Sequence, residues 1–183
     1  MKKENIYNIP NFLTALRIVM TFVIIYMIFL GTKLSTIAIL FILAMITDCL
    51  DGQIARGFNL KTKFGAKFDM IADRLLMIGT VLALIIYSIF SNHVYSLQIK
   101  EIFMIISREI ISFPVFLIAL LLKKKFIAKA RIIGKSVTVL QALAFPSILF
   151  NFNFSVYLSA ITMIVGFFSG LAYLYDVIRI NKK

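Results

Sequence analysis

The chain has 183 residues, of which 61% are hydrophobic, and its mean hydropathy is +0.98. This apolar share excludes an ordinary water-soluble domain and predicts an all-α polytopic membrane protein. The formal net charge is +12, and because most basic residues fall between apolar runs, contact with anionic membrane lipids explains them and no nucleic acid is needed.

Six apolar runs follow one another and predict six transmembrane helices in one bundle. They cover residues 12–30, 36–55, 65–90, 99–122, 135–150 and 155–175. The first run is long enough to span and no small-residue cleavage site follows it, so a secretory signal peptide is not indicated. Since no linker or repeat marks a second domain, we expect residues 1–183 to form a single domain.

The sequence NIPNFLTALRI at residues 8–18 leads into the first apolar run. Asn11 is expected to cap a helix that begins at Phe12, because Asn is favoured at that position. Arg17 is the one charge of the run and has two interpretations. Either Arg17 belongs to a functional site, or its long side chain reaches back to the polar interface of the membrane.

The acidic stretch at residues 48–73 lies at the ends of the second and third runs. Asp48 and Asp51 are three residues apart, and Asp69 and Asp73 are four apart, so each pair shares one face of a helix. Charged groups are costly inside a membrane, and carboxylates without His or Cys favour Mg²⁺ or Mn²⁺ over zinc. Because one short loop joins the two helices, the pairs can face each other and hold two cations.

The loops also predict the orientation of the chain in the membrane. With the N-terminus inside, the loops at residues 57–64 and 123–134 and the C-terminal tail also lie inside. The outer breaks at 31–35 and 91–98 then hold only Lys33. This arrangement follows the positive-inside rule and places both termini and the acidic stretch at the cytoplasmic face of the cell membrane.

Two reactive side chains are interpreted as having no catalytic role. Cys49 is the only cysteine, and without a histidine in range we expect it to pack between helices rather than act as a nucleophile. His93, the only histidine, falls in a break between runs and reads as a solvated loop residue. Without an activated Ser, Cys or His, the sequence favours direct attack of one substrate on the other over a covalent enzyme intermediate.

Arg56 offers a planar fork suited to phosphate, and nearby small residues let a ligand approach the backbone. Together with the acids they form the pattern D-x2-D-G-x2-A-R-x8-G-x3-D-x3-D, with every position filled. This pattern resembles the signature of the CDP-alcohol phosphatidyltransferases. The resemblance implies that the metal ligands are Asp48, Asp51, Asp69 and Asp73, with Asp73 also the catalytic base. It implies that the nucleotide and diphosphate are bound by Asp48, Gly52, Ala55, Arg56 and Gly65.

Members of that family transfer the phosphatidyl group of a CDP-linked lipid to an alcohol and release CMP. The resemblance therefore implies CDP-diacylglycerol as donor, two Mg²⁺ or Mn²⁺ ions as cofactors, a six-helix membrane fold and a homodimer.

Three further segments resemble the bacterial branch that uses glycerol 3-phosphate and forms phosphatidylglycerophosphate. They are NIPN with the following Thr and Arg, SRE at residues 107–109, and GK with the following Thr at residues 134–138. The acceptor phosphate would then be held by Arg108, Arg131 and Lys135. Met70 and Arg74 depart from this branch and are closer to inositol-using members, so inositol phosphate and phosphatidylglycerol stay open as acceptors.

The SRE segment places Arg108 and Glu109 inside the fourth run, where an internal charge pair is expensive. The two residues either neutralise each other or, because adjacent side chains diverge on a helix, find other partners. Pro114 is a candidate site for a kink in the same helix.

Two other classes of protein fit part of the sequence. A cation transporter or channel also needs carboxylates within the membrane, and a structural ion-pair network could combine the acids with Arg56. The acids lie at one membrane face rather than along its depth, which favours the enzyme.

Overall fold

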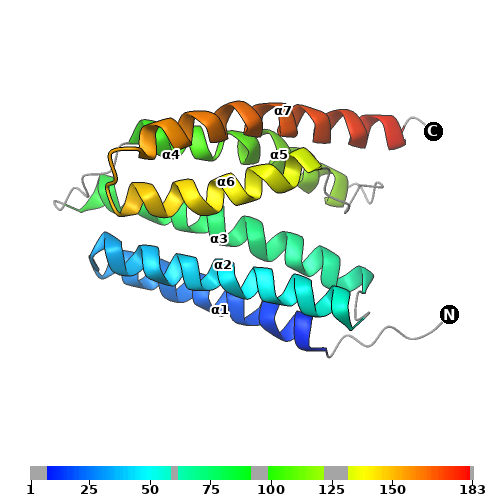
Figure 1. Cartoon of the computed structure of the whole chain (residues 1–183), viewed down its shortest axis with the longest axis horizontal. Helices are drawn as coiled ribbons and strands as arrows, with labels where there is room; N and C mark the ends of the chain where they lie inside the picture. The colour runs from blue at the N-terminus through cyan, green and yellow to red at the C-terminus, as the bar shows by residue number, and fades with distance from the viewer. Residues whose placement is uncertain (1–7, 59–61, 92–98, 122–131, 182–183) are drawn as a thin grey trace. The chain divides into compact units, whose positions relative to one another are not determined.

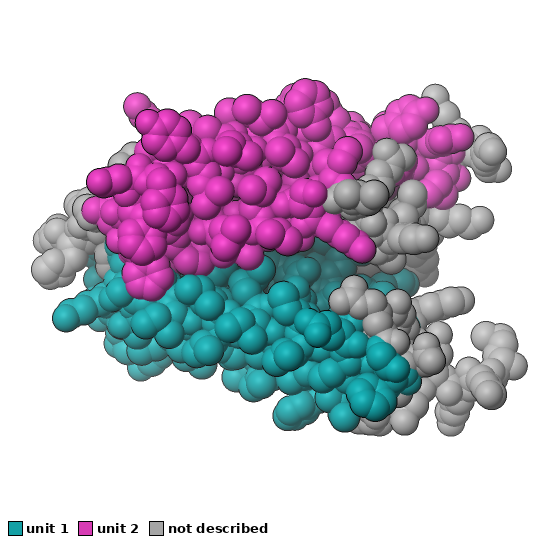
Figure 2. All heavy atoms as spheres, in the orientation of Figure 1, with its two compact units in different colours: residues 1–95 teal, residues 96–183 magenta. Residues whose placement is uncertain are grey.

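A computed structural model describes residues 8–58, 62–91, 99–121 and 132–181 (Figure 1). Within these residues the fold is all-α. The helices are α1 (Ile9–Phe29), α2 (Leu34–Gly57), α3 (Lys63–Phe90), α4 (Ile99–Ile105), α5 (Ser107–Leu121), α6 (Ile132–Leu149) and α7 (Ser155–Asn181). The chain divides into two compact units, Met1–Tyr95 and Ser96–Lys183, which Figure 2 shows in separate colours. Helices α1 to α3 belong to the first unit and α4 to α7 to the second.

Four of the described helices are long and apolar enough to cross a membrane. They are Ile9–Phe29, Leu34–Ala55, Phe64–Phe90 and Ser155–Ile180, and Ile133–Leu149 is a shorter apolar helix. Large apolar side chains such as Phe22, Phe90 and Phe168 are exposed along them, as expected where lipid rather than water covers the surface. The prediction of an all-α polytopic membrane protein is confirmed, and the number of six spans stays a prediction.

Helix α1 begins three residues earlier than the sequence suggested. Asn8, not Asn11, is its N-cap, and the Asn8 Oδ1 accepts a hydrogen bond from the Asn11 backbone N–H at 2.9 Å. Pro10 lies within the first turn, where a missing backbone N–H costs nothing because that group has no partner inside the helix. The proline thus starts the helix instead of preceding it.

Helix α1 is the centre of the first unit. It packs against both α2 and α3, whereas direct packing between α2 and α3 is sparse in the described part of the chain. The buried apolar side chains of the unit come from all three helices and include Ile24, Ile28, Ile37, Phe41, Leu76 and Leu84. The relative position of α2 and α3 therefore depends on what each of them contacts on α1.

The first turn of α3 lies close to the first turn of α1. Thr62 caps α3, and its Oγ1 accepts a hydrogen bond from the Gly65 N–H at 2.9 Å. A Cβ atom on Gly65 would lie 2.5 Å from the Asn11 Oδ1 and 2.9 Å from the Thr62 Oγ1. A larger residue at position 65 would therefore force the side chains of Asn11 and Thr62 to shift.

In the second unit, α7 packs against α4, α5 and α6. The predicted single helix over residues 99–122 is wrong, because the chain forms α4 and α5 with a break at Ile106. Pro114, the expected site of a kink, lies inside α5. At the break, the Ser107 Oγ donates to the Met163 carbonyl at 3.3 Å, and a Cβ on Gly166 would lie 2.9 Å from that Oγ. The chain is thus interrupted where α5 begins its close approach to α7.

We predict that Gly65→Ala lowers stability by about 1–3 kcal/mol, because the new methyl group would collide with oxygens of Asn11 and Thr62. Gly57→Ala is the matched control, since a Cβ on Gly57 meets no atom within 4 Å. Thermal unfolding of the detergent-purified variants, followed by circular dichroism, measures the effect. Equal melting temperatures for the two variants would contradict the close approach of α1 and α3.

Candidate functional site

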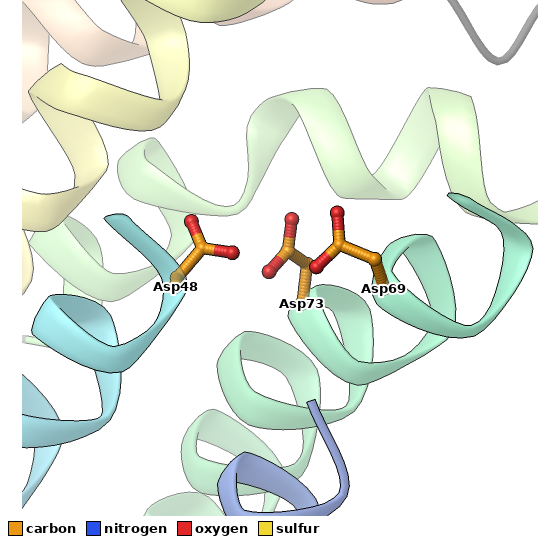
Figure 3. A group of neighbouring side chains, drawn as sticks. All are labelled: Asp48, Asp69 and Asp73. Atoms are coloured by element: carbon orange, nitrogen blue, oxygen red, sulfur yellow. The ribbon is translucent and has the colours of Figure 1, made fainter. Parts of the chain in front are cut away.

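Three carboxylates of the acidic stretch converge at one place in the first unit. Asp48 lies on α2, and Asp69 and Asp73 lie one turn apart on the same face of α3. One oxygen from each carboxylate lies within 4.8 Å of the others. Figure 3 shows the three side chains pointing toward one another from their two helices. The structure thus brings together three of the four predicted metal ligands.

The other residues of the motif lie on the same two helices. Gly52 and Ala55 follow Asp48 on α2 and are half-buried, and Gly65 lies in the first turn of α3. Asp51 and Arg56 belong to the backbone of α2, but their side chains are outside the described part of the structure. Their roles as metal ligand and phosphate ligand stay predictions.

Arg17 of α1 lies at the centre of the three carboxylates. Its Nη1 is 2.8 Å from the Asp48 Oδ1, 3.0 Å from the Asp69 Oδ1 and 2.8 Å from the Asp73 Oδ1. The Arg17 side chain is 0% exposed, while the three carboxylates are 30%, 42% and 43% exposed. The interpretation that Arg17 reaches back to the membrane interface is therefore wrong, because its guanidinium is buried in the protein.

The charges of this cluster suit a divalent cation. Three carboxylates against one guanidinium leave a net charge of −2 when all four groups are ionised. Their oxygens, with no His or Cys among them, form the set that Mg²⁺ and Mn²⁺ prefer. An octahedral Mg²⁺ ion lies about 2.0–2.1 Å from each oxygen ligand, so oxygens within 4.8 Å of one another are near enough to share one ion after moving closer together. The three carboxylates could therefore hold a metal ion.

The residues predicted to bind the acceptor phosphate belong to the second unit. Arg108 is half-buried at the start of α5, and its Nη1 lies 4.0 Å from the Glu109 Oε1. Lys135 is exposed in the first turn of α6. Arg131 lies outside the described residues, so this phosphate site stays a prediction.

Glu109 finds its main partner on another helix, as expected for one of two adjacent charged residues. Its Oε2 accepts a hydrogen bond at 2.7 Å from the Gln141 Nε2, which also donates to the Ile105 carbonyl at 2.9 Å. All of these groups are buried. Sequence reasoning did not single out Gln141, although a lone amide within an apolar run is a signal that a polar partner lies nearby.

Cys49 and His93 are the two side chains that the sequence predicted to have no catalytic role. Cys49 is exposed, so the prediction that it packs between helices is wrong within the described residues. His93 lies outside the described residues.

Comparison with known proteins adds independent evidence for the family. A sequence profile described as CDP-alcohol phosphatidyltransferase matches residues 7–171. The CDP-diacylglycerol–glycerol-3-phosphate 3-phosphatidyltransferase of Wigglesworthia glossinidia brevipalpis is 31% identical over 92% of this chain and 93% of its own length. The enzyme of the same name from Aquifex aeolicus is 32% identical over 77% of this chain and 75% of its own.

A third relative of that name, from Rickettsia typhi, is 50% identical over 72 residues, which are 38% of this chain. That match spans only 40% of the Rickettsia typhi protein, whereas the Wigglesworthia match runs along nearly the whole of both chains. Because the family profile also covers residues 7–171, the chain belongs to the CDP-alcohol phosphatidyltransferase family.

Proposed function

We propose that the chain transfers the phosphatidyl group of CDP-diacylglycerol to glycerol 3-phosphate, forming phosphatidylglycerophosphate and CMP. The observation that carries this proposal is the convergence of Asp48, Asp69 and Asp73 from two helices in a member of this family. The names of the relatives from Wigglesworthia and Aquifex support glycerol 3-phosphate as the acceptor. The family match also favours a transferase over an acid-lined cation pathway.

The family is metal-dependent, and the acidic cluster could bind a metal. We propose that Asp48, Asp69 and Asp73 hold Mg²⁺ or Mn²⁺, and that Asp51 completes a site for two ions. A divalent ion bound there would offset negative charge on the diphosphate as its anhydride bond breaks. Gly52, Ala55, Arg56 and Gly65, together with Asp48, are proposed to contact the nucleotide and diphosphate.

The proposed reaction is a direct displacement at phosphorus. The acceptor hydroxyl oxygen forms a bond to the phosphatidyl phosphorus, and the anhydride bond breaks so that its electron pair leaves with CMP. Asp73 is proposed as the base that takes the hydroxyl proton. Its carboxylate is 43% exposed, as open as that of Asp69 at 42% and more open than that of Asp48 at 30%, so an acceptor molecule can reach it.

Arg108, Arg131 and Lys135 are proposed to hold the phosphate of the acceptor. The contacts of Glu109 support this role for Arg108. Because the Gln141 amide binds Glu109 at 2.7 Å, whereas Arg108 lies 4.0 Å from it, the guanidinium is not committed to a close ion pair with its neighbour. A guanidinium that is not held in a close ion pair with its neighbour can bind a phosphate through two parallel hydrogen bonds.

The membrane arrangement is also part of the proposal. We propose six spans, one family domain over residues 1–183, a homodimer, and a cytoplasmic location for the termini and the active site. The distribution of Lys and Arg in the loops supports this orientation. The family profile runs from residue 7 to residue 171 and so supports treating the two compact units as parts of one domain.

We predict that purified protein releases CMP from CDP-diacylglycerol when glycerol 3-phosphate is the acceptor. Inositol phosphate and phosphatidylglycerol are offered in parallel reactions and are expected to give no release above background. Chromatographic measurement of CMP, with identification of the lipid product, separates the acceptors. Release with a different acceptor would retain the family chemistry and contradict the proposed substrate.

Removal of divalent cations is expected to abolish the transferase activity, because the bound metal is proposed to offset the charge of the diphosphate as its anhydride bond breaks. Treatment with EDTA followed by addition of Mg²⁺ or Mn²⁺ tests this through CMP release. Activity that persists in EDTA would contradict a metal-assisted reaction.

Asp73→Asn is expected to lower the turnover rate by about 10²–10⁴-fold, because an amide cannot accept the hydroxyl proton. The variant should remain folded and bind metal, which thermal unfolding with and without Mn²⁺ verifies. Cys49→Ala is the control, since Cys49 is exposed beside Asp48 and is expected to leave activity unchanged. Full turnover by Asp73→Asn would exclude Asp73 as the base, and loss of folding would favour a structural ion-pair network.

A further inference from the structure

The guanidinium of Arg17 lies where the three carboxylates of the candidate metal site meet. A single nitrogen, Nη1, is within 3.0 Å of an oxygen of Asp48, Asp69 and Asp73. It donates hydrogen bonds to the Asp69 Oδ1 at 3.0 Å and the Asp73 Oδ1 at 2.8 Å. One oxygen of each carboxylate, Oδ1, is therefore engaged by a positive group of the chain itself.

A metal ion and this nitrogen cannot both keep these contacts. Bonds from Mg²⁺ to oxygen are about 2.0–2.1 Å long, so an ion bound through the three Oδ1 atoms would lie in the space that Nη1 fills. A divalent ion and a guanidinium also repel each other strongly at such short range. Metal binding through these three Oδ1 atoms therefore requires Nη1 to move away from at least one of them.

We propose that Arg17 is an internal counter-cation that competes with the metal for its carboxylate ligands. It holds the three carboxylates together before the metal arrives and lowers the affinity of the site for the metal. This inference rests on the proposed metal site, and it concerns a residue outside the motif at residues 48–73.

The burial of Arg17 determines how far the side chain can withdraw. The residue is 0% exposed on α1, the helix that packs against both α2 and α3. Moving its charge into an apolar environment is costly, so the guanidinium shifts only locally and stays beside the metal. Arg17 therefore weakens metal binding twice, once by competing for oxygen ligands and once by repelling the bound ion.

The first test is the affinity for Mn²⁺, measured by the electron paramagnetic resonance signal of unbound Mn²⁺. Arg17→Gln keeps a polar side chain but removes its charge, and we expect it to lower the apparent Kd for Mn²⁺ at least tenfold. Thr21→Val is the matched control. Thr21 is also fully buried one turn along α1, and its Oγ1 donates to the Arg17 carbonyl at 2.9 Å. We expect this variant to bind Mn²⁺ as the unmodified protein does.

The second test is thermal unfolding in EDTA and in Mn²⁺, which needs no enzymatic turnover. Without Arg17 the carboxylates repel one another, so Arg17→Gln should melt at a lower temperature in EDTA and gain more from Mn²⁺ than the unmodified protein. Arg17→Lys retains the charge on a shorter side chain and should fall between the two in both measurements. It keeps the proposal testable if Arg17→Gln does not fold without metal.

The possible outcomes separate this inference from the proposed function. Tighter Mn²⁺ binding by Arg17→Gln, or by Arg17→Lys where the first variant does not fold, supports the competition. Equal or weaker binding by the variants overturns it while leaving the metal site intact. Absence of Mn²⁺ binding in every form, including the unmodified protein, overturns the metal site and this inference together, and CMP release then decides the function independently.

Discussion

The ion contacts of Arg17 with Asp48, Asp69 and Asp73 are the constraint on which the first unit depends. Helices α2 and α3 both pack against α1, and within the described residues they pack little against each other. The guanidinium therefore joins three helices at one point, where like charges would otherwise repel one another. In a membrane, where apolar contact alone does little to choose one helix partner over another, such a polar contact can specify the arrangement. The same contacts therefore hold the three helices together and bring the acidic side chains of the site together.

The second unit uses a buried polar contact in a comparable way. The Gln141 amide joins α6 to Glu109 on α5 and to the carbonyl of Ile105 at the end of α4. This carbonyl lies next to the break at Ile106, so the amide donates to a backbone group close to a place where the helix is interrupted. A satisfied network of this kind also fixes the position of Glu109, which leaves the guanidinium of Arg108 with only a long contact to its neighbour.

The sequence predicted the features that depend on local spacing. The four-residue interval between Asp69 and Asp73 places both on one face of any helix, and the cost of charge in a membrane makes their convergence with Asp48 expected. The contacts of Arg17 could not be predicted in this way, because they require α1 to pack against both acid-bearing helices, which is a tertiary property. The cap at Asn8 and the break before Ser107 likewise depend on competition between neighbouring positions and on close approach to α7.

The position of Arg17 on the first helix has a consequence for how the protein enters the membrane. Chains are synthesised from the N-terminus, so α1 is made before α2 and α3. An aspartate that enters the lipid phase alone carries a penalty, which reaches about 2.5–3.5 kcal/mol at the centre of a membrane helix on insertion scales. Here the basic partner of Asp48, Asp69 and Asp73, Arg17, is already part of the first helix. Successive helices can therefore be inserted as partly neutralised pairs, and membrane integration does not have to wait for a metal ion.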